Sequence, residues 1–154
     1  MSLDLLVDDA LVVPAIVRRR LRVEVARMVR AAARHDRRAD YEVAVRLVGD
    51  LAIHALNRDY RHKNKPTDVL AFAQREGPAG GLHPELLGDI VISVDTARRQ
   101  AKKGLAAELL HLASHGLCHL LGYDHRDDAE ERVMNARAAA LRGEATRRGR
   151  IRPA

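Results

Sequence analysis

Three histidines in the second half of the chain are spaced so that they could bind one metal ion. His115 and His119 are four residues apart, and His125 follows six residues later. Residues four apart lie on the same face of a helix, so His115 and His119 can reach one ion together. Gly122 predicts a sharp helix end, after which the chain can turn back and bring His125 to that ion. Three imidazoles leave a fourth position for water, which is typical of catalytic zinc.

The residue after the first histidine indicates which chemistry this metal site lacks. The same spacing, glycine included, marks the metzincin proteases, in which a glutamate follows the first histidine. Here that position is Gly116, which has no side chain to carry a proton. The pattern therefore predicts a metal site from which the protease base is missing.

The segment that carries the first two histidines is expected to be a buried helix. Leucines surround most of its circumference from Leu105 to Leu121. One polar stripe interrupts them, formed by Glu108, His111, His115 and His119. Buried imidazoles need polar partners, and a shared ion would serve two of them at once. For Glu108 and His111, support of the ligands, a place at the mouth of the cleft and a purely structural role all stay open.

Length and composition favour one domain in a reducing compartment. The chain has 154 residues and one cysteine, which excludes an internal disulfide framework. No apolar run approaches the roughly 18 residues of a membrane span, and three aspartates in the first ten residues argue against a signal peptide. We therefore expect a cytoplasmic protein. Cys118 should point away from the histidine face and act as a small core hydrophobe.

A net charge of +6 favours an anionic partner, although a general bias toward arginine could produce the same charge without any role in binding. The basic residues gather in three segments, namely Arg18 to Arg22, Arg58 to Lys65, and a tail from Arg142 to Arg152. Aromatic residues make up only 3% of the chain. Phosphate contacts rather than base stacking would therefore have to be the main grip on a nucleic acid.

Apolar patterning predicts four strands among about five helices. Strands are expected in residues 4–13 at an edge, 43–47, 68–73, and 88–94 near the centre, where both faces are apolar. Helices are expected from Pro14 to about residue 34, from Gly49 and Asp50 to about 60, from a cap at Asp95 to Gly104, from 105 to 121, and from a cap at Asp127 or Asp128 to about 145. A flexible loop should span residues 77–81.

These elements form one α+β (α/β-like) domain with a small four-stranded mixed sheet and a buried metal-binding helix. We expect the domain to cover residues 1–145. Residues 146–154 are expected to be a basic, flexible tail.

Several blocks of this sequence resemble the YbeY-type rRNA maturation endoribonucleases. Residues 115–125 match the H-G-x-x-H-L-x-G-Y-D-H signature of that family. Residues 56–72 resemble its L-N-x-x-Y-R and K-P-T-D-V-L-S-F blocks, and residues 87–93 resemble its G-D-I strand. Departures are small: Ala71 and Ala73 replace a serine and a proline, and a cysteine stands in the metal motif where leucine is common. None of the departures affects an expected site residue.

The resemblance implies a metal-dependent, single-strand-specific endoribonuclease acting in 3′-end maturation of small-subunit (16S) rRNA and in ribosome quality control. Its partners would be single-stranded rRNA and the small ribosomal subunit, with no membrane and no DNA. One Zn²⁺ ion per chain would be bound by His115, His119 and His125, since imidazole ligands favour zinc.

Arg61 is the expected catalytic residue, because it matches the family's arginine and lies in a basic segment. A guanidinium stays charged while the transition state gains negative charge. Lys63 and Lys65 are expected to bind substrate together with Arg61. A solvated surface charge without a role is the alternative for Arg61. The nucleophile stays open between an activated water and the 2′-hydroxyl of the RNA, and Asp124 is expected to orient a histidine or close the turn.

Two other functions remain as alternatives. A metalloprotease-like hydrolase would explain the metal motif, but the chain lacks the glutamate base. A non-catalytic ribosome-associated RNA-binding factor with a structural metal would explain the charge and the compact fold. Such a site needs a fourth protein ligand, and none follows His125 at a suitable spacing.

Overall fold

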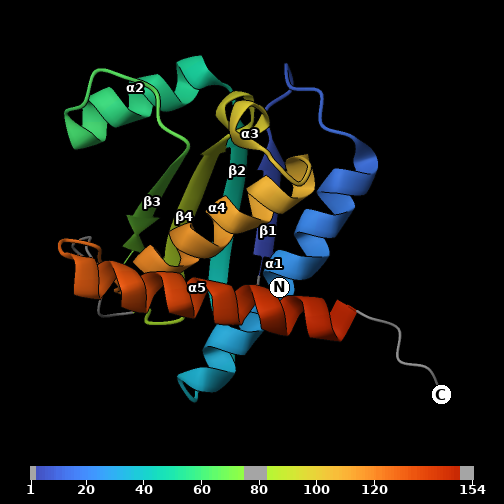
Figure 1. Ribbon diagram of the computed structural model, residues 1–154, viewed down its shortest axis with the longest axis vertical. Helices are drawn as coiled ribbons and strands as arrows, with labels where there is room; N and C mark the ends of the chain where they lie inside the picture. The colour runs from blue at the N-terminus through green and yellow to red at the C-terminus, as the bar shows by residue number, and fades with distance from the viewer. Residues whose placement is uncertain (1–2, 75–82, 150–154) are drawn as a thin grey trace.

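The computed structural model describes residues 3–74 and 83–149, with side chains as far as residue 146 in the last helix. Along the chain the elements are β1 (Leu3–Val7), α1 (Ala15–His35), β2 (Glu42–Val48), α2 (Asp50–Arg61), β3 (Val69–Ala73), β4 (Leu86–Ser93), α3 (Val94–Gln100), α4 (Leu105–Leu120) and α5 (Asp128–Gly149). The α+β class and the four predicted strands and five predicted helices are confirmed within these residues (Figure 1).

The four strands form one mixed sheet in the order β1-β2-β4-β3. β1, β2 and β4 run parallel, and β3 pairs antiparallel with β4. The predicted edge position of the first strand and interior position of residues 88–94 are both confirmed. The first strand ends at Val7, however, so Val12 and Val13 lie outside it, in the connection to α1.

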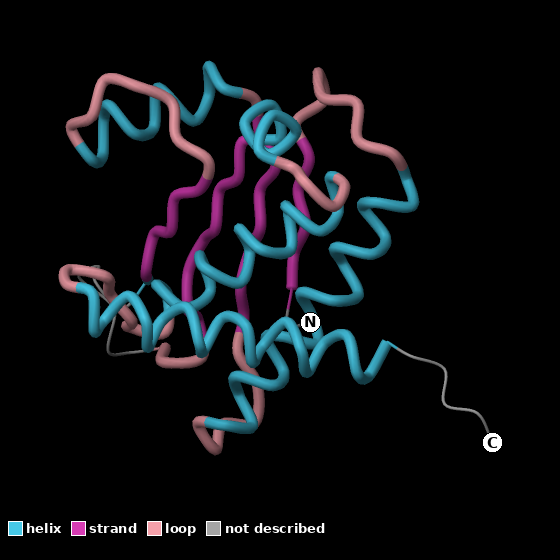
Figure 2. Tube along the Cα trace, viewed as in Figure 1, coloured by secondary structure: helices cyan, strands magenta, loops and turns pink. Residues whose placement is uncertain are grey.

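Helices cover both faces of the sheet. α1, α4 and α5 contact one another, and α4 also packs on β3 and β4 (Figures 1 and 2). The main core lies between these helices and the sheet. A smaller cluster under α2 covers the opposite face with Val48, Ile53, Leu70 and Val91. β3 is therefore an edge strand with α4 on one side and α2 on the other.

Two helix ends differ from the prediction. α3 is capped by Ser93, whose Oγ accepts a hydrogen bond from Thr96 N at 3.2 Å, and not by Asp95. Asp95 instead accepts a hydrogen bond from Asp50 N at 2.9 Å, which joins α3 to the start of α2. α3 already ends at Gln100, and Gly104 precedes α4 rather than ending α3.

The last helix begins as predicted and ends later. Glu130 N donates to Asp127 Oδ1 at 2.8 Å, which identifies Asp127 as the cap. α5 then continues to Gly149, beyond the predicted end near residue 145, so residues 146–149 of the predicted tail are helical. The predicted loop at 77–81 and the remainder of the tail, 150–154, lie outside the described residues.

No helix in residues 3–74 and 83–149 combines the length and the apolar character that crossing a membrane requires.

The contact between α4 and β4 depends on a glycine. A Cβ added to Gly116 would lie 2.6 Å from Cγ2 of Ile90 and 3.2 Å from its Cγ1. Ile90 is fully buried, so its side chain has nowhere to move. Gly116 therefore lets the backbone of α4 approach β4 closely. It also supplies no side chain that could act as a protease base.

We predict that Gly116→Ala lowers the free energy of unfolding by about 1–3 kcal/mol, because the added methyl group overpacks the helix–sheet contact. Gly143→Ala on α5 is a matched control, since an added Cβ there meets nothing within 4 Å. Gly143→Ala should raise the free energy of unfolding by about 0.4–1 kcal/mol, because alanine lowers the conformational entropy of the unfolded chain. Urea denaturation of both variants measures the effect, and a Gly116→Ala protein as stable as wild type would contradict the close contact.

Candidate functional site

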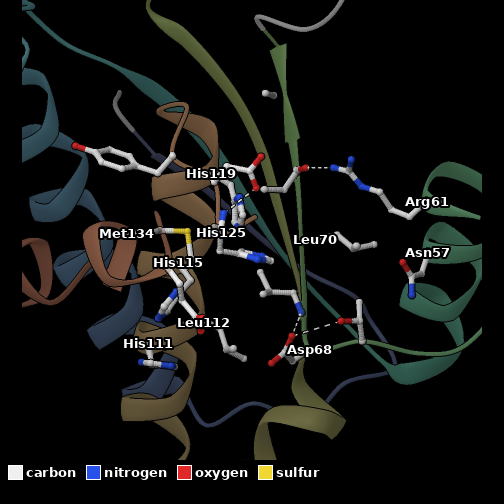
Figure 3. Close-up of a pocket in the computed structure, with 18 of the residues that line it drawn as sticks. Asn57, Arg61, Asp68, Leu70, His111, Leu112, His115, His119, His125 and Met134 are labelled. Atoms are coloured by element: carbon white, nitrogen blue, oxygen red, sulfur yellow. Dashed lines mark hydrogen bonds between the residues drawn. The ribbon is translucent and has the colours of Figure 1, made fainter. Parts of the chain in front are cut away.

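A pocket of about 820 Å³ lies between the edge of β3, the end of α2, α4 and the first turns of α5. Every residue predicted for the site lines it: Arg61, Lys63, Lys65, His115, His119 and His125. In Figure 3 the histidines lie on one side of the pocket and Arg61 on the other, with Leu70 and Asp68 between them. The structure thus brings together two sequence segments, 61–65 and 115–125, that are 50 positions apart at their nearest residues.

The end of α4 brings His125 back to the pocket. Gly122 has φ of 100°, the left-handed conformation that glycine tolerates. Tyr123 N donates to the Cys118 carbonyl and Gly122 N to the His119 carbonyl, both at 3.0 Å. These two bonds form a Schellman motif, which reverses the chain direction. The predicted role of Gly122 is confirmed.

The imidazoles meet in two pairs. The ring centres of His119 and His125 are 5.1 Å apart, and those of His111 and His115 are 4.5 Å apart. Two imidazoles bound to one tetrahedral zinc at about 2.0–2.1 Å would have ring centres about 5 Å apart, so the first pair fits a shared ion. Within the described part of the chain, no three His, Cys, Asp or Glu side chains are close enough together to hold an ion. The three-histidine site therefore stays a prediction.

Burial keeps the two helical imidazoles neutral, the form in which histidine binds metals. It lowers the pKa of His115 from its ordinary 6.5 to about 4, with smaller contributions from His111, Arg142 and His119. Burial also lowers the pKa of His119, assisted by His125 and by the positive charge of Arg61. Both rings are thus available as ligands at neutral pH.

Arg61 is the last residue of α2 and is held against β3. Its guanidinium donates a hydrogen bond to the Ala71 carbonyl, and its Cζ lies 5.5 Å from the centre of the Phe72 ring. The side chain remains exposed and lines the pocket. Arg58 to Arg61, the first part of the basic segment, thus belong to the last turn of α2, which ends one residue beyond the predicted end near residue 60.

The loop that carries the two lysines is fixed by Asn57, which the sequence analysis did not single out. Asn57 is only 3% exposed, and its Nδ2 donates to the Lys65 carbonyl at 2.9 Å. Lys63 N donates to the Asn57 carbonyl at 3.2 Å, and His62 between them adopts the left-handed conformation with φ of 59°. No sequence pattern shows that this amide is buried, so its role becomes visible only in the structure.

Asp68 is a second pocket residue that the sequence analysis missed. Its Oδ1 accepts from Val69 N at 2.8 Å, and its Oδ2 accepts from Gln100 Nε2 at 3.3 Å. Gln100 also donates to Glu108 at 3.3 Å, so it links the pocket carboxylate to the start of α4. Glu108 thus has a structural contact, whereas His111 lines the pocket itself.

Two residues near the histidines have the predicted structural character. Asp124 closes the turn, since its Oδ1 accepts from His125 N at 2.8 Å and its Oδ2 pairs with Arg126 at 3.2 Å. Cys118 is fully buried, and burial raises its thiol pKa to about 11. A protonated, buried thiol fits a core residue and not a metal ligand.

α5 supplies a wall of the pocket that the sequence did not predict, formed by Glu131, Met134 and Asn135. It is tied to α4 by Arg142, whose Nη1 donates to Ser114 Oγ at 2.7 Å. Ser114 Oγ in turn donates to the His111 carbonyl at 2.7 Å. Contacts between distant helices carry no local sequence signal, so this wall could not be foreseen.

Comparison with known proteins identifies relatives along most of the chain. A family model described as Endoribonuclease YbeY matches residues 14–145. A protein of that name from Anaeromyxobacter sp. (strain Fw109-5) is 46% identical over 140 residues, covering 85% of this chain and 69% of the relative. Another from Syntrophotalea carbinolica is 49% identical over 107 residues, covering 66% of this chain and 71% of the relative.

The fold has a counterpart among solved structures. A solution structure of a Thermotoga maritima protein superimposes with a TM-score of 0.59 over 93% of this chain and 88% of the other, at 23% identity. That likeness concerns the fold alone. With a family model that spans most of the described residues and relatives near half identity, the chain belongs to the YbeY endoribonuclease family.

Proposed function

We propose that this protein is an endoribonuclease that cleaves single-stranded RNA with one divalent metal ion, most suitably zinc, bound by His115, His119 and His125. The observation that carries the proposal is one pocket lined both by the three histidines and by Arg61, Lys63 and Lys65, with Arg61 on the side opposite the histidines. Burial keeps the imidazole of His115 neutral there. Membership of the YbeY family supports RNA as the substrate.

More specifically, we propose that the substrate is small-subunit rRNA and that the protein cleaves it near its 3′ end. This cleavage would take place in the cytoplasm, during ribosome maturation and quality control. This assignment, and the small ribosomal subunit as partner, rest on the family resemblance and not on the geometry of the pocket.

The histidines and the basic residues of the pocket would have different roles in the reaction. A divalent ion on the histidines would supply Lewis-acid polarisation of a phosphoryl oxygen. Lys63 and Lys65 would hold the RNA backbone through its phosphates. Arg61 would offer two N–H groups to the scissile phosphate and keep its charge as the oxygens become more negative. Contact with Ala71 and Phe72 holds its guanidinium in place, which reduces the entropy lost on binding.

We predict that the purified protein contains about one zinc ion per chain. His115→Ala and His119→Ala should each lose it, because two imidazoles alone bind zinc much more weakly. His54→Ala is the control, since this histidine lies on α2, bonds to Asn64 Oδ1 at 2.8 Å and does not line the pocket. Elemental analysis by mass spectrometry is the measurement. No metal above background in the wild type, or unchanged metal in both pocket variants, would refute the site.

We predict that Arg61→Ala slows RNA cleavage about 10²–10³-fold while it keeps its metal and its fold. RNA affinity should fall much less, because the two lysines still bind phosphates. Arg61→Lys should restore little, since an ammonium group cannot make the two-pronged contact. Single-turnover cleavage and a binding titration at fixed salt separate the two effects.

Arg58→Ala is the matched control for that experiment. Arg58 lies in the same helical turn, pairs with Asp59 at 3.0 Å and does not line the pocket. It should cleave at the wild-type rate. If Arg61→Ala cleaves like Arg58→Ala, or if its loss is wholly explained by weaker binding, Arg61 has no catalytic role.

We predict no peptidase activity, because Gly116 supplies no base and Ile90 leaves no room for one. A positioned base typically contributes about 10²–10⁴-fold to such a reaction. Incubation of the metal-loaded protein with casein tests this. Chelator-sensitive cleavage of casein that follows the protein through purification and disappears in His119→Ala would favour the metalloprotease alternative instead.

A further inference from the structure

We propose that Tyr60 forms a subsite that stacks one unpaired nucleobase of the RNA, next to the pocket. The inference rests on the proposed function and deepens it, because it assigns a base contact to a site described so far only through phosphates and metal. It adds one base contact to the phosphate contacts that the low aromatic content favours as the main means of binding.

The few aromatic side chains of this chain are unevenly placed. There are three tyrosines and one phenylalanine. Tyr41 is only 1% exposed and belongs to the core, whereas Tyr60 is 65% exposed. The phenylalanine, Phe72, lies directly against Tyr60, with ring centres 5.5 Å apart and planes at 73°. Tyr60, the most exposed tyrosine among the described residues, therefore packs against the ring of Phe72.

The geometry leaves a stacking surface open. In an edge-to-face pair, at least one face of each ring is free of its partner. Because Phe72 is partly buried and Tyr60 is exposed, the open face of Tyr60 is the one that solvent reaches. An exposed, supported aromatic face binds a base without a large loss of side-chain entropy and without preference for sequence.

Arg61 connects this surface to the pocket. Its guanidinium contacts the same Phe72 ring, 5.5 Å from the centroid, while it lines the pocket that holds the histidines. The side chains of Tyr60 and Arg61 therefore both contact the ring of Phe72. A strand whose phosphate lies at Arg61 has an adjacent nucleotide within reach of Tyr60, and an unpaired strand has bases free to turn onto it.

The sharpest test is a binding titration of the full chain with short single-stranded RNA probes that carry one abasic nucleotide at successive positions. In wild type, removal of the base that stacks on Tyr60 should weaken binding about 5- to 150-fold, the equivalent of about 1–3 kcal/mol per stacked base. Tyr60→Ala should lose the same factor with the intact probe and should show no further loss with that abasic probe. Tyr60→Phe should behave like wild type.

Two further variants separate stacking from other effects. Tyr60→Leu keeps apolar bulk over Phe72 but removes the ring, so it should bind like Tyr60→Ala and serves in its place if that variant does not fold. Leu51→Ala is the matched control, because Leu51 is an 88% exposed apolar residue on the same helix. It should leave binding unchanged. Melting temperatures confirm that each variant is folded.

The outcomes distinguish this inference from the proposed function. If wild type binds and cleaves RNA while Tyr60→Ala and Tyr60→Leu match Leu51→Ala, the nucleobase subsite is wrong and the endoribonuclease proposal stands. An equal effect of Tyr60→Ala on every abasic probe would also overturn the subsite. If wild type binds no single-stranded RNA, both proposals fall.

Discussion

The contact between Gly116 and Ile90 is the constraint on which the rest of the site depends. It sets how closely α4 approaches β4, and α4 carries two of the three histidines. α4 contacts both β4 and the edge strand β3, and its histidines line the pocket beside β3. Burial in this position lowers the pKa of both His115 and His119. The packing of α4 on the sheet and the neutral form of its histidines are therefore linked.

The opposite wall of the pocket is built on the edge strand. β3 pairs antiparallel with β4 at the edge of the sheet. The loop that precedes β3 begins at the end of α2 and stays close to that helix. Asn57 ties the loop to α2, and Arg61 ties α2 to β3. The cationic wall is thus held by hydrogen bonds from the buried Asn57 and the exposed Arg61, whereas the histidine wall is held by tight apolar packing.

Much of this arrangement could be predicted from the sequence, because the decisive signals are local. The helix that carries His115 and His119, the turn at Gly122 and the apolar strand predicted at 88–94 each depend on a few neighbouring residues. The structure confirms the helix and the turn, and it places the strand at Leu86–Ser93. The errors arose where two patterns competed. Ser93 and Asp95 are both good helix caps, and only the tertiary bond from Asp50 shows why the serine is used. The α5 wall, Asn57 and Asp68 required knowledge of which distant segments meet, and no periodicity contains that knowledge.

The bond between Arg61 and the Ala71 carbonyl also has a consequence for solubility. An edge strand presents unpaired backbone groups on which the strand of another molecule can add, and proteins commonly blunt such edges with charge. Here a guanidinium occupies one of those carbonyl groups and places a positive charge beside it. Two copies that approached each other through β3 would bring like charges together and would each have to release this bond. The same side chain that faces the pocket therefore also discourages self-association of the sheet.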